Sequence, residues 1–409
     1  MHLKVSDLVR AARSRWEEHA TELSDALRPE LGQAVTLAAN LGDFGICGRN
    51  DFELLIDYDG AIERLVGDIH AANRHIHLLY YIFADDETGR RVFEALGQAA
   101  RRGVKCRVLI DGIGSRRALR TLAPVMRAAG VEVHALLPVG LFRRKAARFD
   151  LRNHRKIAVI DGCIGYFGSQ NIVALERVED CRNEELVARV TGPLVAQLQA
   201  VFLMDRYLET QASLQDSDLF PEPLCKGTAP AQVLPSGPTY PSENAHQIMV
   251  ALMYGARQRI VITTPYFIPN EPFLQAMQAA VHRGIEVHLV MSRQTDHALA
   301  SLAQKSYYDE LLAMGVRIHL YEGHFLHAKH ISIDDCVALI GSSNMDIRSF
   351  ALNSEVSVLI YDAGVVARLW EIQERYFAKS HLLTREEWGQ RPLAAQFLQN
   401  IARLADSFL

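Results

Sequence analysis

One pattern of residues occurs twice in this sequence of 409 residues, and it constrains the fold more than any other feature. In each copy a His is followed by a Lys at offset two, an Asp at offset seven, a Ser at offset fifteen and an Asn at offset seventeen. The copies are His154, Lys156, Asp161, Ser169 and Asn171, and His327, Lys329, Asp334, Ser342 and Asn344. Two copies with the same offsets are too specific for chance. The repeat therefore predicts two copies of one domain.

The segments around the repeat alternate between strand-like and helix-like patterns. In the first half, residues 76–83 and 104–110 are apolar runs typical of buried strands, and residues 88–102 between them have helical periodicity. The order returns in the second half with a strand over 259–268, a helix over 271–283 and a strand over 287–291. This alternation predicts an α/β protein whose two domains are related by a pseudo-twofold axis, with both motifs at the domain interface. If both His act on one phosphate, they must lie within about 10 Å of each other or be brought there by closure.

Composition changes mark the expected boundaries. We expect an N-terminal amphipathic helical segment over 1–45, a first domain over 46–207 and a second domain with a C-terminal helix over 246–409. Residues 208–245 are rich in Pro, Ser, Gly and Asp, which predicts a connector. A stripe of apolar residues in the C-terminal helix favours core packing, with membrane contact as the alternative: Leu393, Phe397, Ile401, Leu404 and Phe408.

Charge and cysteine content exclude several classes of protein. The net charge is −4, which rules out a global polycation that coats nucleic acid. Six cysteines without a CxxC pair argue against a disulfide framework or a zinc ribbon and favour a reduced, cytoplasmic setting. No stretch approaches the roughly 18 apolar residues of a spanning helix, so we expect a soluble or peripheral protein.

The repeated residue types suit chemistry on a phosphodiester. Residues i and i+2 of a strand share a face, so each His and its Lys point the same way. One imidazole can attack phosphorus while the other protonates the leaving alcohol, and Lys, Ser and Asn can hold the anion without a metal or other cofactor. We take His154, Lys156, Asp161, His327, Lys329 and Asp334 as the candidate catalytic residues. The candidate phosphate-binding residues are Ser169, Asn171, Ser342 and Asn344.

The two motifs resemble the HKD motifs of the phospholipase D superfamily. Other short stretches of the sequence resemble those of bacterial cardiolipin synthases. These stretches are Gln232-Val-Leu-Pro-Ser-Gly-Pro238, Thr264-Pro-Tyr-Phe-Ile-Pro269 and Gly341-Ser-Ser-Asn-Met-Asp-Ile-Arg-Ser349. The resemblance implies duplicated phospholipase D-like domains, each a mixed β-sheet flanked by helices. It also implies phosphatidyl transfer between two phosphatidylglycerol molecules through a phosphohistidine, which releases glycerol.

In the family, an acidic residue downstream of each motif orients its His. The matching residues are Glu185, 31 positions after His154, and Glu355, 28 positions after His327. Typical members begin with two membrane-spanning helices that this sequence lacks, and many have Gly where Ser169 stands. By resemblance, we expect His154 to be the nucleophile and His327 the general acid and then base.

A basic stretch just before the first motif predicts contact with anionic lipid at a membrane surface: Arg143, Arg144, Lys145 and Arg148. We expect peripheral attachment to the cytoplasmic face of the bacterial inner membrane, with phosphatidylglycerol or phosphatidylethanolamine as donor and no nucleic-acid partner. A solvated loop or a patch that binds nucleic-acid phosphates is the alternative for the basic stretch. Two other functions remain open: a phospholipase D-type hydrolase acting on phospholipid or nucleic acid, and a non-catalytic membrane scaffold.

Overall fold

A computed structural model describes residues 27–138, 150–178, 181–214, 218–241, 243–295 and 297–404. The first half runs in the order β1 (Cys47–Leu55), α4 (Tyr58–Ala71), β2 (His75–Tyr80), α5 (Glu87–Arg101), β3 (Lys105–Asp111), α6 (Arg116–Thr121), α7 (Ala123–Ala128), β4 (Glu132–Leu136), β5 (Lys156–Ile160), β6 (Ile164–Gly168), β7 (Glu176–Val178), β8 (Cys181–Glu184), β9 (Val187–Thr191) and α8 (Leu194–Thr210). Helix α3 (Pro29–Gly42) precedes it.

The second half repeats the main elements of this order, with short insertions within it and three further elements at its end. Its elements are β10 (Ala229–Ser236), α9 (Asn244–Gly255), β11 (Arg259–Thr263), β12 (Phe267–Ile268), α10 (Glu271–His282), β13 (Glu286–Ser292), α11 (Ala298–Ser306), α12 (Tyr308–Met314), β14 (Arg317–Tyr321), β15 (Phe325–Leu326), β16 (His330–Ile333), β17 (Val337–Gly341), β18 (Met345–Asp346), α13 (Ile347–Ala351), β19 (Glu355–Ile360), α14 (Ala363–Ala378), β20 (Ser380–Leu383), α15 (Arg385–Gly389) and α16 (Leu393–Arg403).

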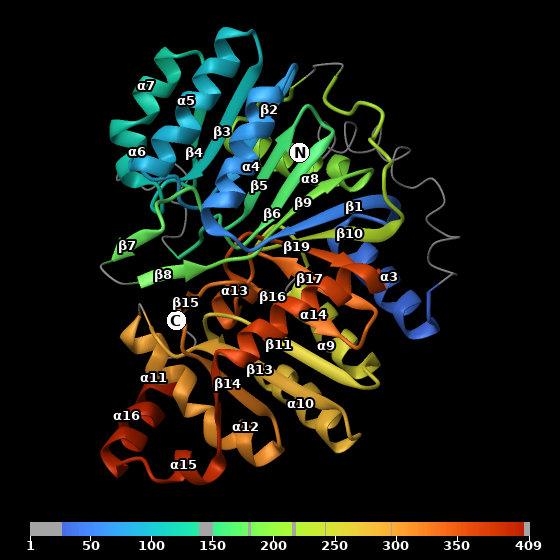
Figure 1. The fold of residues 1–409 in the computed structure, drawn as a ribbon, viewed down its shortest axis with the longest axis vertical. Coiled ribbons are helices and arrows are strands. Elements are labelled where there is room, and N and C mark those ends of the chain that lie inside the picture. Colours follow the sequence, from blue (N-terminus) through green and yellow to red (C-terminus); the bar gives the residue numbers. More distant parts are fainter. Residues whose placement is uncertain are drawn as a thin grey trace.

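Fifteen strands form one mixed sheet that runs through both halves. Their order is β20-β14-β13-β11-β16-β17-β19-β10-β1-β9-β6-β5-β2-β3-β4. Strands β1 and β10 pair antiparallel in the middle, and the order on one side of this seam mirrors the order on the other. The sheet therefore contains an approximate twofold axis at the seam, as the repeat predicts, and the two halves lie one above the other in Figure 1.

The expected βα alternation is confirmed in both halves. Helix α5 ends before Gly103 and α10 ends before Gly284, and both glycines have a positive φ that favours this residue at a helix end. The strand expected over 259–268 is split into β11 and β12. Apolar side chains from the two sheet faces fill three cores, and one core lies across the seam beneath α8 and α14.

Strand β10 lies within the segment that the sequence assigns to a connector. Two prolines in this strand, Pro230 and Pro235, are typical of a loop. Ala231, Val233 and Leu234 are nevertheless fully buried, because β10 is a central strand between β1 and β19. The connection between the halves therefore ends before Ala229.

The N-terminal and C-terminal helical segments differ in how they pack. Helix α3 buries Leu31, Val35 and Ala38 against the second half, while residues 1–26 lie outside the described residues. The core packing expected for the C-terminal stripe is wrong, because α16 turns its large apolar residues toward solvent. Phe408, the last residue of that stripe, lies outside the described part of the chain.

Candidate active site

Each motif His is held by a glutamate from the other half of the molecule. His154 Nδ1 lies 2.9 and 3.0 Å from the two carboxylate oxygens of Glu355. His327 Nδ1 lies 2.8 Å from Glu185 Oε1. Both glutamates are buried, with exposed fractions of 0% for Glu355 and 2% for Glu185. The two His–Glu pairs therefore cross between the halves.

This crossing corrects the expected assignment of the orienting residues. The sequence pairs each His with the glutamate downstream of its own motif, but the structure pairs it with the glutamate of the other motif. The reason lies in two short contacts between the halves. Strand β8 pairs in parallel with β15, and Asn153 forms an isolated bridge with Ser354.

The backbone contacts at these two places are nearly symmetric. The His154 amide donates to the Ser354 carbonyl at 2.8 Å. The His327 amide donates to the Glu184 carbonyl at 2.9 Å. Each His is thus bonded at its backbone to the residue just before the glutamate that binds its ring. Figure 1 shows β8 and β15 next to each other where the two halves meet.

The buried carboxylates determine which ring nitrogen carries the proton. An ionised carboxylate only accepts hydrogen bonds, so Nδ1 of each His is the donor and Nε2 keeps the lone pair in the neutral ring. Burial tends to raise the pKa of Glu185, but His327 and Lys329 outweigh it and hold this pKa at about 2. Burial lowers the pKa of His154 to about 4, against the opposing effect of Glu355. His154 is therefore neutral at physiological pH, with Nε2 ready to act as a nucleophile.

The motif lysines occupy equivalent buried positions. Lys156 Nζ donates to the His154 carbonyl at 2.6 Å, and Lys329 Nζ donates to the His327 carbonyl. Burial is the main cause that lowers the pKa of Lys156 to about 7; Glu355 opposes this shift and the nearby Lys329 adds to it. The two cations thus lie next to the two imidazoles, as the i, i+2 spacing predicts.

Both histidines line one cavity of about 820 Å³ between the halves. Asn171 and Asn344 line it as well, in accord with their assignment as phosphate-binding candidates. The carbonyl oxygen of Asn171 accepts from the Ile82 amide at 3.1 Å, which leaves its NH2 group as the donor for a ligand. The cavity therefore brings together two imidazoles and two amides.

The wall of this cavity also contains two arginines that the sequence did not place in the site. Arg152 and Arg348 line it and add positive charge. Arg348 lies in the stretch Gly341–Ser349 that carries the family resemblance, so that resemblance could have identified Arg348 as a site residue. Tyr81 and Tyr266, which end matching segments, line the cavity too, and the Tyr81 ring packs edge-on against His154 at 4.8 Å.

Ser169 and Ser342 hold the glutamates in place and do not line the cavity. Ser342 Oγ donates to the Glu355 carboxylate and accepts from the Val356 amide. Ser169 Oγ accepts from the Leu186 amide at 3.0 Å, next to Glu185. Both serines are fully buried. This placement does not fit their prediction as phosphate-binding residues, because a side chain bonded to the buried glutamate segment cannot also reach a ligand.

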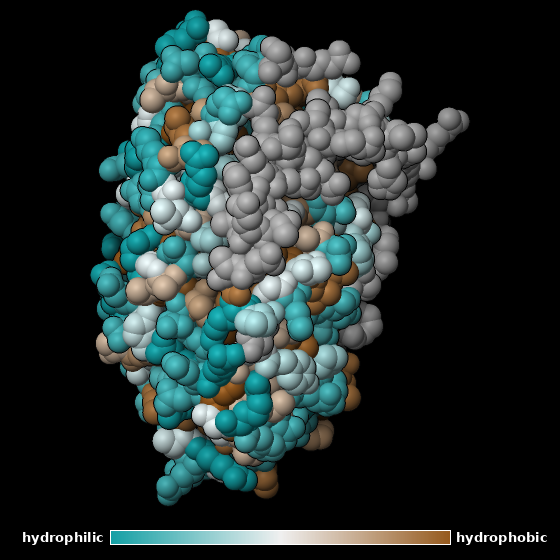
Figure 2. Space-filling view, turned by 90° about the vertical axis from the view of Figure 1, so that its right-hand side faces the viewer, coloured by the Kyte–Doolittle hydropathy of each residue, from teal (hydrophilic) through white to brown (hydrophobic). Residues whose placement is uncertain are grey.

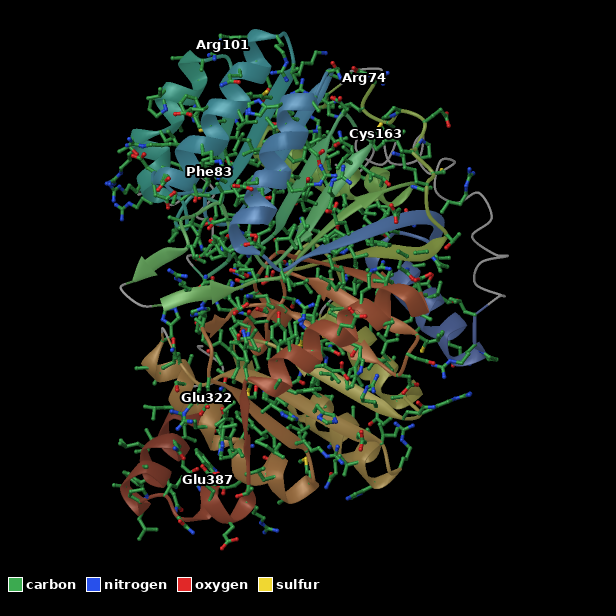
Figure 3. All side chains as sticks on the ribbon, in the orientation of Figure 1. Arg74, Phe83, Arg101, Cys163, Glu322 and Glu387 are labelled. Carbon is green, nitrogen blue, oxygen red and sulfur yellow. The ribbon has the colours of Figure 1, made fainter. Side chains whose placement is uncertain are left out.

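Asp161 and Asp334 lie at the opposite ends of their strands from the motif lysines. The Asp161 carboxylate accepts from the backbone amides of residues 73, 74 and 75, at 2.7 to 3.0 Å. Asp334 accepts from the amides of residues 257, 258 and 259. Figure 3 labels Arg74 and Cys163 beside the first contact, at the end of β2 far from Phe83. The two aspartates therefore fasten neighbouring strands and do not fit the catalytic role predicted for them.

One further prediction concerns a part of the chain outside the described residues. The basic residues Arg143, Arg144, Lys145 and Arg148 lie outside the described residues.

Within the described ranges, no three or more His, Cys, Asp or Glu side chains gather in a way that could hold a metal ion. No described helix is both long and apolar enough to cross a bilayer.

The geometry supports nucleophilic substitution at phosphorus. Both imidazoles line one cavity, one neutral ring can attack, and the other ring can carry a proton to or from an alcohol. Lysine and arginine cations with asparagine amides supply positive charge and donors for the non-bridging oxygens of the phosphate. Each imidazole is oriented by a carboxylate, which stabilises the ring when it becomes charged.

Comparison with known proteins agrees with this chemistry. The family described as "Cardiolipin synthase, PLD-like domain" matches residues 65–206 and 249–377, one segment in each half. Cardiolipin synthase A of Yersinia pseudotuberculosis (serotype O:1b, strain IP 31758) is 37% identical over 406 residues, which cover 93% of this chain and 82% of the relative.

Solved structures show the same fold at low identity. Phosphatidylserine synthase of Haemophilus influenzae Rd KW20 superposes with a TM-score of 0.70 at 15% identity, over 93% of this chain and all of that one. Polyphosphate kinase from Porphyromonas gingivalis superposes with a TM-score of 0.53, also at 15% identity, over 88% of this chain and 53% of its own. With the crossed His–Glu pairs in place, the matches over both halves show that this chain belongs to the cardiolipin synthase family of phospholipase D-like phosphatidyltransferases.

Proposed function

We propose that the protein transfers a phosphatidyl group from one phosphatidylglycerol molecule to another and produces cardiolipin and glycerol. One observation supports this most directly: two carboxylate-oriented imidazoles line a single cavity in a chain of this family. The family kinship supports anionic phospholipids as substrates. The site of action that we propose is the cytoplasmic face of the bacterial inner membrane.

In the first half-reaction, His154 Nε2 attacks the phosphorus of the donor lipid. A P–N bond forms and the P–O bond to the terminal glycerol breaks. His327 begins this step as the imidazolium, with Nδ1 on the buried Glu185. It donates its Nε2 proton to the departing alkoxide, so free glycerol leaves and His327 becomes neutral. Lys156 and Lys329 balance the charge that builds up on the phosphoryl oxygens.

In the second half-reaction, the terminal hydroxyl of a second phosphatidylglycerol enters the space that glycerol left. Neutral His327 takes the hydroxyl proton as the oxygen attacks phosphorus. The P–N bond breaks and His154 Nε2 regains its lone pair. Cardiolipin leaves, and the protein returns to its starting protonation state.

A product assay tests this function against the hydrolase alternative. Purified protein is incubated with phosphatidylglycerol vesicles, and lipids and glycerol are measured. We expect cardiolipin and glycerol in equal amounts. Phosphatidic acid and glycerol without cardiolipin would show that water is the acceptor, as in a phospholipase D. Vesicles that contain labelled phosphatidylethanolamine as a second donor report on the choice of donor.

Trapping the intermediate tests the roles of the two imidazoles. His327→Ala keeps the proposed nucleophile, so it should accept a labelled phosphatidyl group slowly and retain it on residue 154. His154→Ala should retain no label. The proteins are quenched at alkaline pH, where phosphohistidine survives, and the label is mapped. Label on residue 327 of the His154→Ala protein would reverse the assignment.

A further inference from the structure

Helix α16 packs with its small and polar side and turns its large apolar side outward. Leu393, Phe397, Ile401 and Leu404 lie on one side of the helix and are 81%, 66%, 48% and 83% exposed. The other side contains Gln399 and Ala402, which are buried. This is the reverse of α14, in which Val366, Leu369 and Ile372 face the core. Burying large apolar side chains stabilises a protein, so the exposed side of α16 is the kind of surface that contacts another phase or partner.

Side-chain contacts on the packed side fix this orientation. Arg391 forms an ion pair with Asp309 of α12 and a hydrogen bond with Gln399. Arg403, at the other end of the helix, pairs with Glu310 of α12 at 3.0 Å. Both ends of α16 are therefore held, and the helix cannot roll its apolar side inward without breaking these contacts.

Helix α16 lies next to an element at the rim of the active-site cavity. Helix α16 packs along α11, and Ala298, Leu299 and Ala300 at the start of α11 line the cavity. Leu299 is 50% exposed on this rim, and Ile113 is 43% exposed where the first half meets the same cavity. In Figure 1 these elements lie along the left-hand side of the molecule. Figure 2 shows the opposite side, where hydrophilic residues are interspersed with separate hydrophobic ones.

The charges around this surface complement an anionic bilayer. The segment 391–404 contains no carboxylate, but its two arginines are paired with Asp309 and Glu310 of α12, so the cations for headgroups must come from the first half. On the first half, α6 follows Ile113 directly and exposes Arg116, Arg117 and Arg120. Cations at the rim and apolar side chains beside them are the combination that binds a membrane interface.

We propose that the exposed side of α16, together with Leu299 and Ile113, docks the protein on the bilayer that holds its lipid substrates. The apolar side chains enter the boundary between headgroups and acyl chains, and the α6 arginines contact anionic headgroups. The cavity mouth then faces the membrane, so a phosphatidylglycerol headgroup reaches His154 while its acyl chains remain in the bilayer. This proposal rests on the proposed function, because it takes its partner from the lipid nature of the substrate.

Paired variants test the surface. Phe397→Gln combined with Ile401→Gln removes two exposed apolar side chains, and Leu208→Gln combined with Tyr254→Gln does the same on α8 and α9, away from the cavity. Binding is measured by co-sedimentation with vesicles of phosphatidylglycerol and phosphatidylcholine. We expect the α16 pair to weaken vesicle binding by about tenfold or more and the control pair to leave it within about twofold. Arg116→Gln combined with Arg120→Gln should weaken binding to these vesicles and not to phosphatidylcholine alone.

Turnover with two substrate forms separates docking from chemistry. The α16 pair should lose turnover on vesicles in proportion to binding and keep it on dihexanoyl phosphatidylglycerol below its micelle concentration. Its melting temperature should equal that of the unmodified protein, because the changed side chains are exposed.

Three results would overturn the docking surface: unchanged vesicle binding by the α16 pair, an equal loss in the control pair, or a dimer that dissociates only in the α16 pair, which would assign this side to a second copy of the chain. A protein that binds vesicles through α16 and makes no cardiolipin from either substrate would instead refute the proposed function and leave the docking surface intact.

Discussion

The crossed His–Glu pairs make a prediction that the uncrossed arrangement does not. Glu355→Gln removes one negative charge and keeps the size of the side chain, next to a His154 ring nitrogen 2.9 Å away. When His154 becomes charged on forming the phosphohistidine, an ion pair with about 4 Å between charge centres stabilises it by roughly 4 kcal/mol at an effective dielectric constant of about 20. Part of that energy is recovered through the remaining amide hydrogen bond, which is worth about 1 kcal/mol. A net loss of about 3 kcal/mol corresponds to a rate reduction of about 10² to 10³.

Two measurements detect the effect of Glu355→Gln at His154. The rate at which label appears on His154 in the His327→Ala background should fall by the factor above when Glu355→Gln is added. Nitrogen chemical shifts of the labelled imidazoles should show a change of tautomer at His154 in Glu355→Gln, because an amide NH2 can donate to Nδ1 and move the proton to Nε2. Glu185→Gln should change the His327 signals instead.

The matched control is Glu184→Gln, one residue from the other orienting glutamate. The Glu184 side chain accepts from the Tyr321 hydroxyl at 2.9 Å and contacts neither imidazole. This variant should keep the rate within about threefold, since it loses at most part of one partly exposed hydrogen bond. If Glu185→Gln slowed the labelling of His154 and altered its signals more than Glu355→Gln did, the reasoning from the crossed pairs would be refuted.

Three further outcomes are expected. Asp161→Asn and Asp334→Asn should each lower the free energy of unfolding by about 1 to 3 kcal/mol, seen as a lower melting temperature, while kcat per folded molecule stays within about threefold, because these carboxylates bind backbone amides away from the cavity. The pH profile of kcat/KM should rise as His154, with its pKa of about 4, loses its proton, and fall as the general acid His327, whose pKa burial lowers, and Lys156, with its pKa of about 7, lose theirs; Lys156→Arg should remove the lysine's part of the falling limb, and an unchanged limb would assign it to His327 alone. Treatment with EDTA should leave activity unchanged because lysine and arginine side chains supply the positive charge at the phosphate, and activity lost with EDTA and restored by a divalent ion would contradict this.

The repeated motif was enough to predict the duplicated α/β fold and the cavity that His154 and His327 share. Identical offsets imply identical local structures, and two half-sites on two copies can meet only between them. The offsets contain no information about which copy of the glutamate binds which His. That choice depends on β8 and the Asn153–Ser354 bridge, which are contacts across the halves that no local spacing encodes.

Each of the remaining differences has its own physical cause. A strand with Pro230 and Pro235 resembles a loop in sequence, and only its place between β1 and β19 makes it a buried strand. The apolar stripe of α16 has the periodicity of a core helix, but periodicity does not say which side packs; in the structure Arg391 and Arg403 pair with α12 on the packed side. Asp161 shares a motif with His154 yet binds backbone amides at the other end of its strand, since five residues of a strand span about 16 Å.

The crossing also explains how one site can serve two half-reactions without rearranging. Each half supplies its own His and Lys, and takes from the other half both the glutamate and the carbonyl that fix the His. Neither half-site is complete alone, so the rate of the reaction depends on how the two halves are placed relative to each other. The sheet that continues through the β1–β10 seam fixes this position with backbone hydrogen bonds. Between the two half-reactions only protons and the phosphatidyl group need to move, and the electrostatic environment built for the first phosphorus transition state is already in place for the second.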